Sequence, residues 1–169
     1  LVYDKGSSQF EAEPLEGVAL DDLDIELLES YRTAISANQD LASLLRNRGL
    51  ATKNGVITVA GYLLFGTFPQ DKFPNAHIRI IKYLSDNRGT GSGLNVDGNH
   101  DYRVEGPIPR AVMRARNILQ KLVPVRRHLG DGGLFENQSL IPEPAWLEGL
   151  VNAAIHRSYS LAGDHVRIE

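Results

Sequence analysis

The order in which helical and strand periodicities follow one another constrains the fold of this chain more than any other feature. Apolar residues recur at helical spacing in several segments, and β-branched or alternating residues mark short strands between some of them. The predicted helices are 21–36, 39–49, 58–66, 106–127 and 142–160, and the predicted strands are 77–84, 102–106, 139–141 and 164–169. Because helices and strands do not alternate regularly, the pattern predicts an α+β fold with mixed helices and short strands.

Local signals bound several of these segments. Gly49 is placed to end the second helix, and Asn54 with Gly55 predicts a tight turn. Thr58 is the predicted N-cap of a short apolar helix that ends at Gly66. The remaining predictions are an extended lead-in at 1–20, a polar loop at 85–99 and a turn at 131–133.

Composition excludes several classes of protein. The chain has no cysteine, which excludes disulfides, thiolate metal sites and thiol catalysis. No apolar run approaches the ~20 residues that a membrane-spanning helix needs, and the first residues do not form a signal peptide. We therefore expect a cytoplasmic protein with no membrane partner. Because the chain starts at Leu1 and ends inside a predicted strand, we expect it to be a fragment of a longer protein.

Charge is distributed unevenly along the chain. Acids concentrate in residues 1–30, and bases concentrate in residues 103–128. At 100° per residue, Arg110, Arg114 and Lys121 fall within a narrow arc of the predicted basic helix. Such a stripe could neutralise the phosphates of a nucleic acid. The simpler interpretation is the solvated face that an amphipathic helix has in any case, and both interpretations stay open.

Two other motifs carry little weight. The GTGSG segment at 89–93 lacks the preceding strand, the following helix and the Lys-Ser/Thr pair of a phosphate-binding loop. The five histidines form no close pair at metal-ligand spacing, so a zinc site has no support. We interpret the glycine-rich segment as a connector.

The segment PEPAWLEGLVNAAIHRSYS, residues 142–160, is the strongest candidate for chemistry. Helical projection places Glu148, Asn152 and His156 within an arc of about 80°. A carboxylate can orient or deprotonate an attacking water, and an amide oxygen suits a hard cation such as magnesium. The predicted core face on the other side consists of Trp146, Leu147, Leu150, Val151, Ala154 and Ile155. Spacing alone favours a simpler interpretation, the polar outer face of an amphipathic helix.

Gly149 and Ala153 lie beside the polar arc of this helix. Residues this small would let a ligand come close to the backbone. The helix therefore combines a packing face with a face that could receive a ligand.

This segment resembles the N-box helix of GHKL ATPases. It is more similar still to the divergent branch found in Schlafen/AlbA-like transcriptional regulators, which are often labelled RecG-related DNA helicases. Ser158 departs from that family's pattern, which usually has Asp there. The residues that match it are Pro142, Ala145, Glu148, Leu150, Val151, Asn152, Ala153, His156, Arg157 and Tyr159. Two earlier segments, ITVAGYLLFGTFPQDKFPNAHIRI and VEGPIPRAV, are similar to the same family, so that the likeness spans roughly residues 20–169.

The resemblance implies a role for each matching polar residue. Glu148 would be the general base that activates water, and Asn152 would ligate the magnesium that bridges the nucleotide phosphates. His156 and Arg157 would support the cofactor site. In the intact protein the resemblance implies ATP and Mg²⁺ as cofactors and DNA as a partner, with a homo-oligomer left open. We expect no cofactor in this fragment.

The resemblance also implies three parts. Residues 1–19 would be the lead-in from a missing N-terminal DNA-binding domain, because YDKGSSQF resembles that domain's exit strand. Residues 20–138 would be a central α+β domain, and residues 139–169 would begin a truncated GHKL-like ATPase module. The Asp-x-Gly-x-Gly box and the glycine-rich lid of GHKL enzymes do not follow the N-box here, and LGDGGL at 129–134 precedes it.

We therefore expect a fragment of a DNA-binding transcriptional regulator with a GHKL-like ATP-binding module, with no ATP hydrolysis of its own. The intact protein would be the ATPase. No Walker A motif is present, so the helicase label finds no support in the sequence. The alternative is a nucleic-acid-binding or dimerisation module with no nucleotide chemistry.

Overall fold

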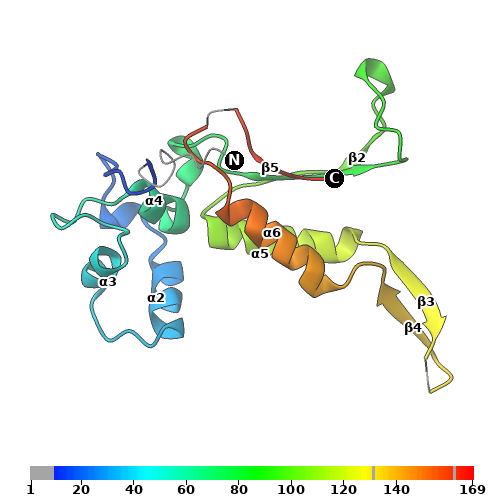
Figure 1. The fold of residues 1–169 in the computed structure, drawn as a ribbon, viewed down its shortest axis with the longest axis horizontal. Coiled ribbons are helices and arrows are strands. Elements are labelled where there is room, and N and C mark those ends of the chain that lie inside the picture. Colours follow the sequence, from blue (N-terminus) through cyan, green and yellow to red (C-terminus); the bar gives the residue numbers. More distant parts are fainter. Residues whose placement is uncertain (1–9, 131, 162) are drawn as a thin grey trace, which may run out of the picture. The chain divides into compact units, whose positions relative to one another are not determined.

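The computed structural model describes residues 10–130, 132–161 and 163–169. The fold is α+β, as the sequence predicts (Figure 1). The helices are α2 (Ile25–Ala34), α3 (Leu41–Asn47), α4 (Val59–Phe65), α5 (Ile108–Leu122) and α6 (Glu143–Ile155), with 3-10 helices η1 (Leu20–Asp22), η2 (Pro69–Asp71) and η3 (Gly91–Gly93). The strands are β1 (Ile78–Tyr83), β2 (Val96–Val104), β3 (Val125–Leu129), β4 (Phe135–Ser139) and β5 (Val166–Ile168).

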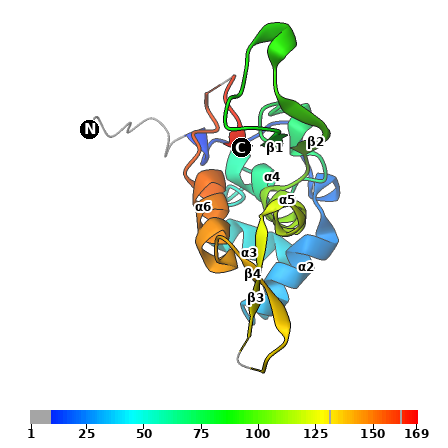
Figure 2. The ribbon, with the colours of Figure 1, turned by 90° about the vertical axis from the view of Figure 1, so that its right-hand side faces the viewer.

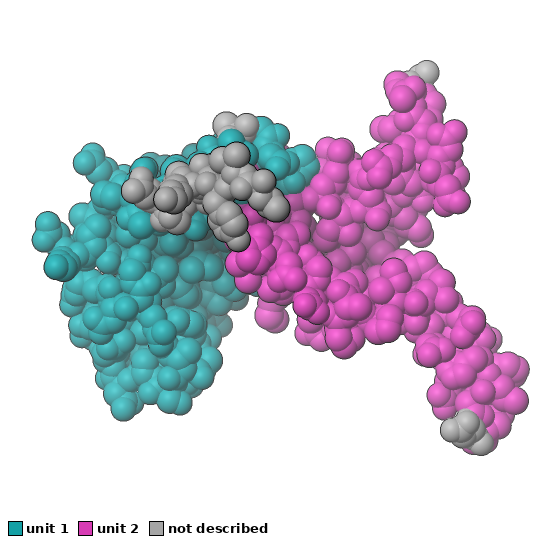
Figure 3. Space-filling model, viewed as in Figure 1, with its two compact units in different colours: residues 1–77, 105–111, 158–165 teal, residues 78–104, 112–157, 166–169 magenta. Residues whose placement is uncertain are grey.

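Contacts divide the chain into two compact units, shown in different colours in Figure 3. Unit 1 is made of the described residues within 1–77, 105–111 and 158–165. Unit 2 is made of those within 78–104, 112–157 and 166–169. The predicted functional boundaries near residues 19 and 138 stay predictions. No described helix is both long and apolar enough to cross a membrane.

Side-chain caps fix where the helices of unit 1 begin. Asp24 accepts a hydrogen bond from the backbone N–H of Leu27, and Asp40 accepts one from that of Ser43. Thr58 caps α4 as predicted, since its Oγ1 accepts from the N–H of Gly61 at 3.2 Å. Each cap satisfies one N–H that has no partner within the first turn.

Two glycines form turns between α3 and α4. Gly49 follows α3 with a left-handed φ of 70°, and Gly55 forms the predicted turn with a φ of 86°. Residues 10–19 run beside the start of α4, where Pro14 forms an isolated bridge with Thr58.

The core of unit 1 lies among α2, α3 and α4. Gly61 lets α4 approach the preceding segment closely, because a Cβ there would lie 2.2 Å from the carbonyl oxygen of Leu50. The buried apolar side chains are Leu23, Leu28, Leu44, Leu45, Leu50, Ala51, Ile57, Tyr62 and Phe65.

Buried Gln70 ties the start of α5 to this unit. Its side-chain amide donates to the carbonyl oxygen of Gly106 at 3.1 Å and to that of Ala76. Its side-chain oxygen accepts from the N–H of Gly106 at 2.9 Å. These bonds hold the backbone just before α5 in place, so the helix begins from a fixed position in unit 1.

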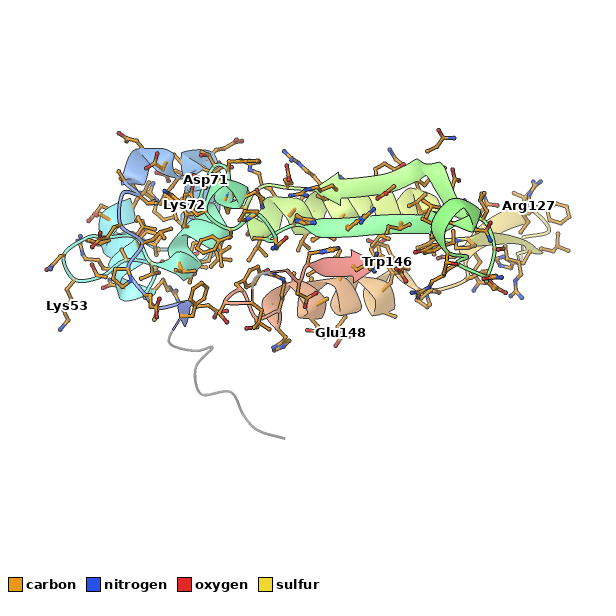
Figure 4. All side chains as sticks on the ribbon, turned by 90° about the horizontal axis from the view of Figure 1, so that it is seen from above. Lys53, Asp71, Lys72, Arg127, Trp146 and Glu148 are labelled. Carbon is orange, nitrogen blue, oxygen red and sulfur yellow. The ribbon has the colours of Figure 1, made fainter. Side chains whose placement is uncertain are left out.

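Unit 2 is built on a three-stranded sheet with the order β2-β1-β5. The central strand β1, the clearest strand in the sequence, pairs antiparallel with β2 and parallel with β5. Helices α5 and α6 lie on the same side of this sheet (Figures 1 and 4). The buried apolar residues of the strands are Ile78, Ile80, Ile81, Val104 and Val166, and those of the two helices within the unit are Ala115, Leu119, Leu150 and Ala154.

Several helix and strand boundaries differ from the sequence predictions. The helix predicted over 106–127 ends at Leu122, because Pro124 cannot continue a helix and the next residues form β3. The strand predicted over 139–141 begins earlier, at Phe135, and β2 begins at Val96 inside the predicted polar loop. Residues 3–9 of the predicted exit strand and residue 131 of the predicted turn lie outside the described residues.

Strands β3 and β4 form a separate two-stranded antiparallel sheet between α5 and α6 in the chain (Figure 2). Val125 pairs with Ser139 at one end of the ladder, and Leu129 pairs with Phe135 at the other. Eight of its ten residues are exposed, and His128 and Ser139 are half-buried. Because it has no buried side, its sequence lacks the apolar alternation that predicts a strand.

Candidate functional site

Helix α6 carries Glu148 and Asn152. It begins as predicted but ends at Ile155, five residues before the predicted end at residue 160. Pro142 is the N-cap and Pro144 lies in the first turn, where no intrahelical N–H bond is lost. The helix ends at Ile155, and the N–H of the C-cap residue His156 donates to the carbonyl oxygen of Asn152 at 2.9 Å. His156 is exposed and lies just beyond the last helical turn.

One side of α6 is buried and the opposite side is exposed. Leu150 and Ala154 are 3% and 2% exposed, whereas Glu148 and Asn152 are both exposed. Four helical residues place Glu148 and Asn152 about 40° apart around the axis, on neighbouring turns. Figure 4 shows Glu148 and the half-buried Trp146 leaving the helix on opposite sides. The carboxylate and the amide therefore share the exposed side.

The prediction that Ile155 belongs to the core face is wrong, because this residue is 61% exposed. At 100° per residue, Ile155 lies about 140° from Leu150 and close to the direction of Glu148. The exposed side of α6 is therefore mixed, with an isoleucine beside a carboxylate and an amide.

The same side of α6 is open near the backbone. A Cβ placed on Gly149, beside Glu148, would meet no atom within 4 Å. Ala153, beside Asn152, is exposed as well. The small residues predicted to allow close approach of a ligand are therefore accessible.

Glu143, in the first turn of α6, joins this helix to α5. Arg116 Nε donates to Glu143 Oε1 at 2.7 Å, and Gln120 Nε2 donates to the same oxygen at 3.1 Å. These hydrogen bonds, that of Arg116 first, hold the pKa of the Glu143 carboxyl below its usual range. The contact helps to fix the rotation of α6 within unit 2. Sequence reasoning missed this pair, although an acid in a first helical turn is a common stabilising feature.

The other predicted site residues have different surroundings. Arg157 follows α6, is half-buried and is engaged with other groups. On α5, Arg114 and Lys121 are exposed, and Arg114 also has an interaction partner. No group of three or more His, Asp or Glu residues within the described ranges is arranged to hold a metal ion.

Arg110, the first residue of the predicted basic stripe, is bound by carboxylates of unit 1. Its Nη2 donates to Asp24 Oδ1 at 2.9 Å and to Glu26 Oε2 at 3.1 Å, and its Nε donates to Asp24 Oδ2. This hydrogen bonding raises the pKa of the Arg110 guanidinium, and it lowers that of the Asp24 carboxyl. Arg110 would have to give up these bonds to contact a phosphate.

Comparison with known proteins adds information on the fold. No protein-family model matches the chain, and no curated protein matches it. Among solved structures, the chain is similar to the crystal structure of the DIP2311 protein from Corynebacterium diphtheriae, with a TM-score of 0.61 and 21% sequence identity. The match covers 95% of this chain and 31% of that chain. The two proteins thus share a fold, and this chain spans about a third of the length of that one.

Proposed function

We propose that this chain belongs to a DNA-binding transcriptional regulator in which α6 forms one wall of an ATP–Mg²⁺ site. The observation that carries the proposal is the orientation of α6 about its own axis. Leu150 and Ala154 anchor one side, while Glu148 and Asn152 face outward together. The resemblance of this helix to the GHKL N-box adds the identity of the ligand.

The residues on this face suit the proposed chemistry. Mg²⁺ usually keeps several waters and takes few protein ligands besides phosphate oxygens, so that one amide oxygen from Asn152 suffices on this side. When bound, the ion would neutralise phosphate charge. The Glu148 carboxylate, one turn away, would orient and deprotonate the attacking water. Gly149 leaves room for the phosphates to approach the helix backbone.

A site on an exposed helix face needs further walls to exclude water. We propose that other parts of a longer protein supply them. The size of the similar solved protein supports this, because the fold of this chain accounts for only 31% of that chain. The exposed Ile155 beside Asn152 supports it too, since a covering segment would bury this side chain.

The test is ATP turnover by the longest gene product that contains this chain. A general base contributes about 10²- to 10⁴-fold, so Glu148→Gln should lower kcat by that factor while ATP still binds. Glu16→Gln, which changes an exposed carboxylate of unit 1, is the matched control and should keep wild-type turnover. Wild-type turnover by Glu148→Gln would remove this residue from the role of base.

A second candidate, nucleic-acid contact without nucleotide chemistry, is favoured by the exposed Arg114 and Lys121 on α5. Arg110 weakens it because two carboxylates already bind this side chain. Phosphate contact predicts an affinity for duplex DNA that falls steeply with salt, and replacing Lys121 by Gln should lower the slope by about one ion. Absence of binding at low salt would identify the stripe as a solvated face.

A further inference from the structure

The β3–β4 hairpin exposes apolar side chains that nothing in the proposed nucleotide site uses. Val125, Leu129 and Phe135 are 60%, 63% and 69% exposed. The strand register places these three on one face of the hairpin together with Arg127. The Arg127 guanidinium lies 5.5 Å from the centre of the Phe135 ring, so the middle of this face is charged.

The hydrogen-bond pattern shows which backbone groups of β4 point away from β3. At the two ends of the hairpin, the N–H of Leu140 donates to the oxygen of Pro124, and the N–H of Gly130 donates to that of Leu134, each at 2.9 Å. Hydrogen-bonded and non-hydrogen-bonded pairs alternate along an antiparallel ladder. The residues of β4 whose N–H and C=O groups point outward are therefore Phe135, Asn137 and Ser139.

We propose that β4 pairs edge to edge, antiparallel, with β4 of a second copy of this chain about a two-fold axis at Asn137. In this register Asn137 exchanges two backbone hydrogen bonds with the partner's Asn137, and Phe135 does the same with the partner's Ser139. The two hairpins become one sheet with the order β3-β4-β4-β3. A two-stranded hairpin is marginal in water and gains stability from added strands.

Charge favours pairing of two copies through the edge of β4 over pairing through the edge of β3. The same two-fold pairing through β3 would place Arg127 opposite the partner's Arg127, and Arg126 opposite the partner's His128. Like charges directly opposite each other are destabilising, and charged residues commonly protect an exposed edge. On β4, Glu136 would face the partner's Gln138, so no like charges meet.

Charge also disfavours stacking of two hairpins through their apolar faces. Arg127 lies between Val125 and Leu129 in the centre of that face. Stacking about a two-fold axis would bury two guanidinium groups against each other without carboxylates. Edge pairing leaves Arg127 in solvent and adds a neighbouring strand beside Phe135.

The first test compares proline at the two edges of the same hairpin. Asn137→Pro removes an outward N–H of β4 and Arg127→Pro removes one of β3, and neither N–H contributes to the β3–β4 ladder. Analytical ultracentrifugation of the chain over rising concentration, without nucleotide, should show a dimer for wild type and for Arg127→Pro. Asn137→Pro should be monomeric, while its amide NMR spectrum shows that the fold is retained.

The second test changes charge opposite Glu136. Gln138→Glu places like charges across the proposed interface, although it adds an attractive neighbour to Arg126 inside the hairpin. Gln138→Lys places opposite charges across the proposed interface and like charges beside Arg126 inside the hairpin. Because each change occurs twice in a symmetric dimer, we expect the dimer dissociation constant to rise about threefold to tenfold for Gln138→Glu and to fall by a similar factor for Gln138→Lys.

Several results would overturn the proposal. A monomer at every concentration would show that β4 does not pair with a second copy of the chain. A dimer that survives Asn137→Pro would show that the interface lies elsewhere. Equal loss in both proline variants, or the opposite order of the two Gln138 variants, would reject this register. All of these measurements are made without nucleotide, so they fail or succeed independently of the site on α6.

Discussion

At the scale of single residues, Asp24 has two functions. Its carboxylate caps α2 by accepting from the Leu27 N–H at 3.0 Å, and it binds the Arg110 guanidinium. Arg110 lies far along the sequence but in the same unit, so one side chain connects the start of α2 to the start of α5. Only the capping function could be predicted from the sequence, because no local pattern indicates the distant partner.

Replacing Asp24 should separate these functions. We expect Asp24→Ala to lower the free energy of unfolding by about 1–3 kcal/mol, because a cap contributes ~0.5–2 and a partly exposed ion pair ~0.2–1 kcal/mol. Asp24→Asn keeps a capping oxygen and should lose less. Urea denaturation at neutral pH measures both, with the exposed Asp21→Ala as control. Equal losses for Ala and Asn would show that the cap contributes nothing.

The same residue predicts a dependence on pH. The hydrogen bond from Arg110, followed by that from the Leu27 N–H, lowers the pKa of the Asp24 carboxyl in the folded protein, although burial opposes them. Its stabilisation is complete above the unfolded pKa of about 3.9 and is lost as pH falls through the lower folded value. The difference in unfolding free energy between wild type and Asp24→Asn should therefore shrink only below about pH 4. A difference that shrinks between pH 7 and 5 would contradict this assignment.

At the scale of elements, two glycines in helices have opposite surroundings. Gly61 in α4 faces the Leu50 carbonyl, and a Cβ there would also lie 3.0 Å from Ile57 Cγ2. Gly149 in α6 faces open space. Neither position has a left-handed φ, so packing alone distinguishes them.

These two glycines form a matched pair for mutation. Gly61→Ala should destabilise the protein by about 1–3 kcal/mol, since buried backbone must move to admit the methyl group. Gly149→Ala should be neutral or stabilise it by up to about 1 kcal/mol, because alanine favours helix over glycine. Thermal unfolding followed by circular dichroism measures both changes. A destabilised Gly149→Ala would mean that this face of α6 is covered.

The sequence predicts the helices of this fold better than its strands, for physical reasons. Asp40, Thr58 and Gly49 supply local capping chemistry, so the ends of α3 and the start of α4 could be predicted. β3, β4 and the first part of β2 contain no buried residue, and they form because each pairs with a second strand across a turn or loop. In the candidate site, periodicity identified the side of α6 with Glu148 and Asn152. Ile155 was assigned to the core side for its apolar character, although a spacing of 100° per residue places it near Glu148.

At the scale of the whole molecule, the chain has two compact units, and the candidate site lies on a helix of unit 2. An ion pair between Glu143 and Arg116 holds that helix against α5, with Arg116 Nη2 and Glu143 Oε1 2.5 Å apart. The fold recurs as part of a longer solved chain. In the proposed function, α6 is one wall of a nucleotide site that other parts of a longer protein would complete.

The most direct measurement of this claim is the Mg²⁺ dependence of ATP affinity in the longest gene product that contains the chain. Calorimetric titration with and without Mg²⁺ should show tighter binding with the ion for wild type and for Glu148→Gln. In Asn152→Ala that gain should fall at least about tenfold, because the variant lacks the proposed protein ligand of the ion. An undiminished gain in Asn152→Ala would contradict the account, because α6 would then not hold the metal.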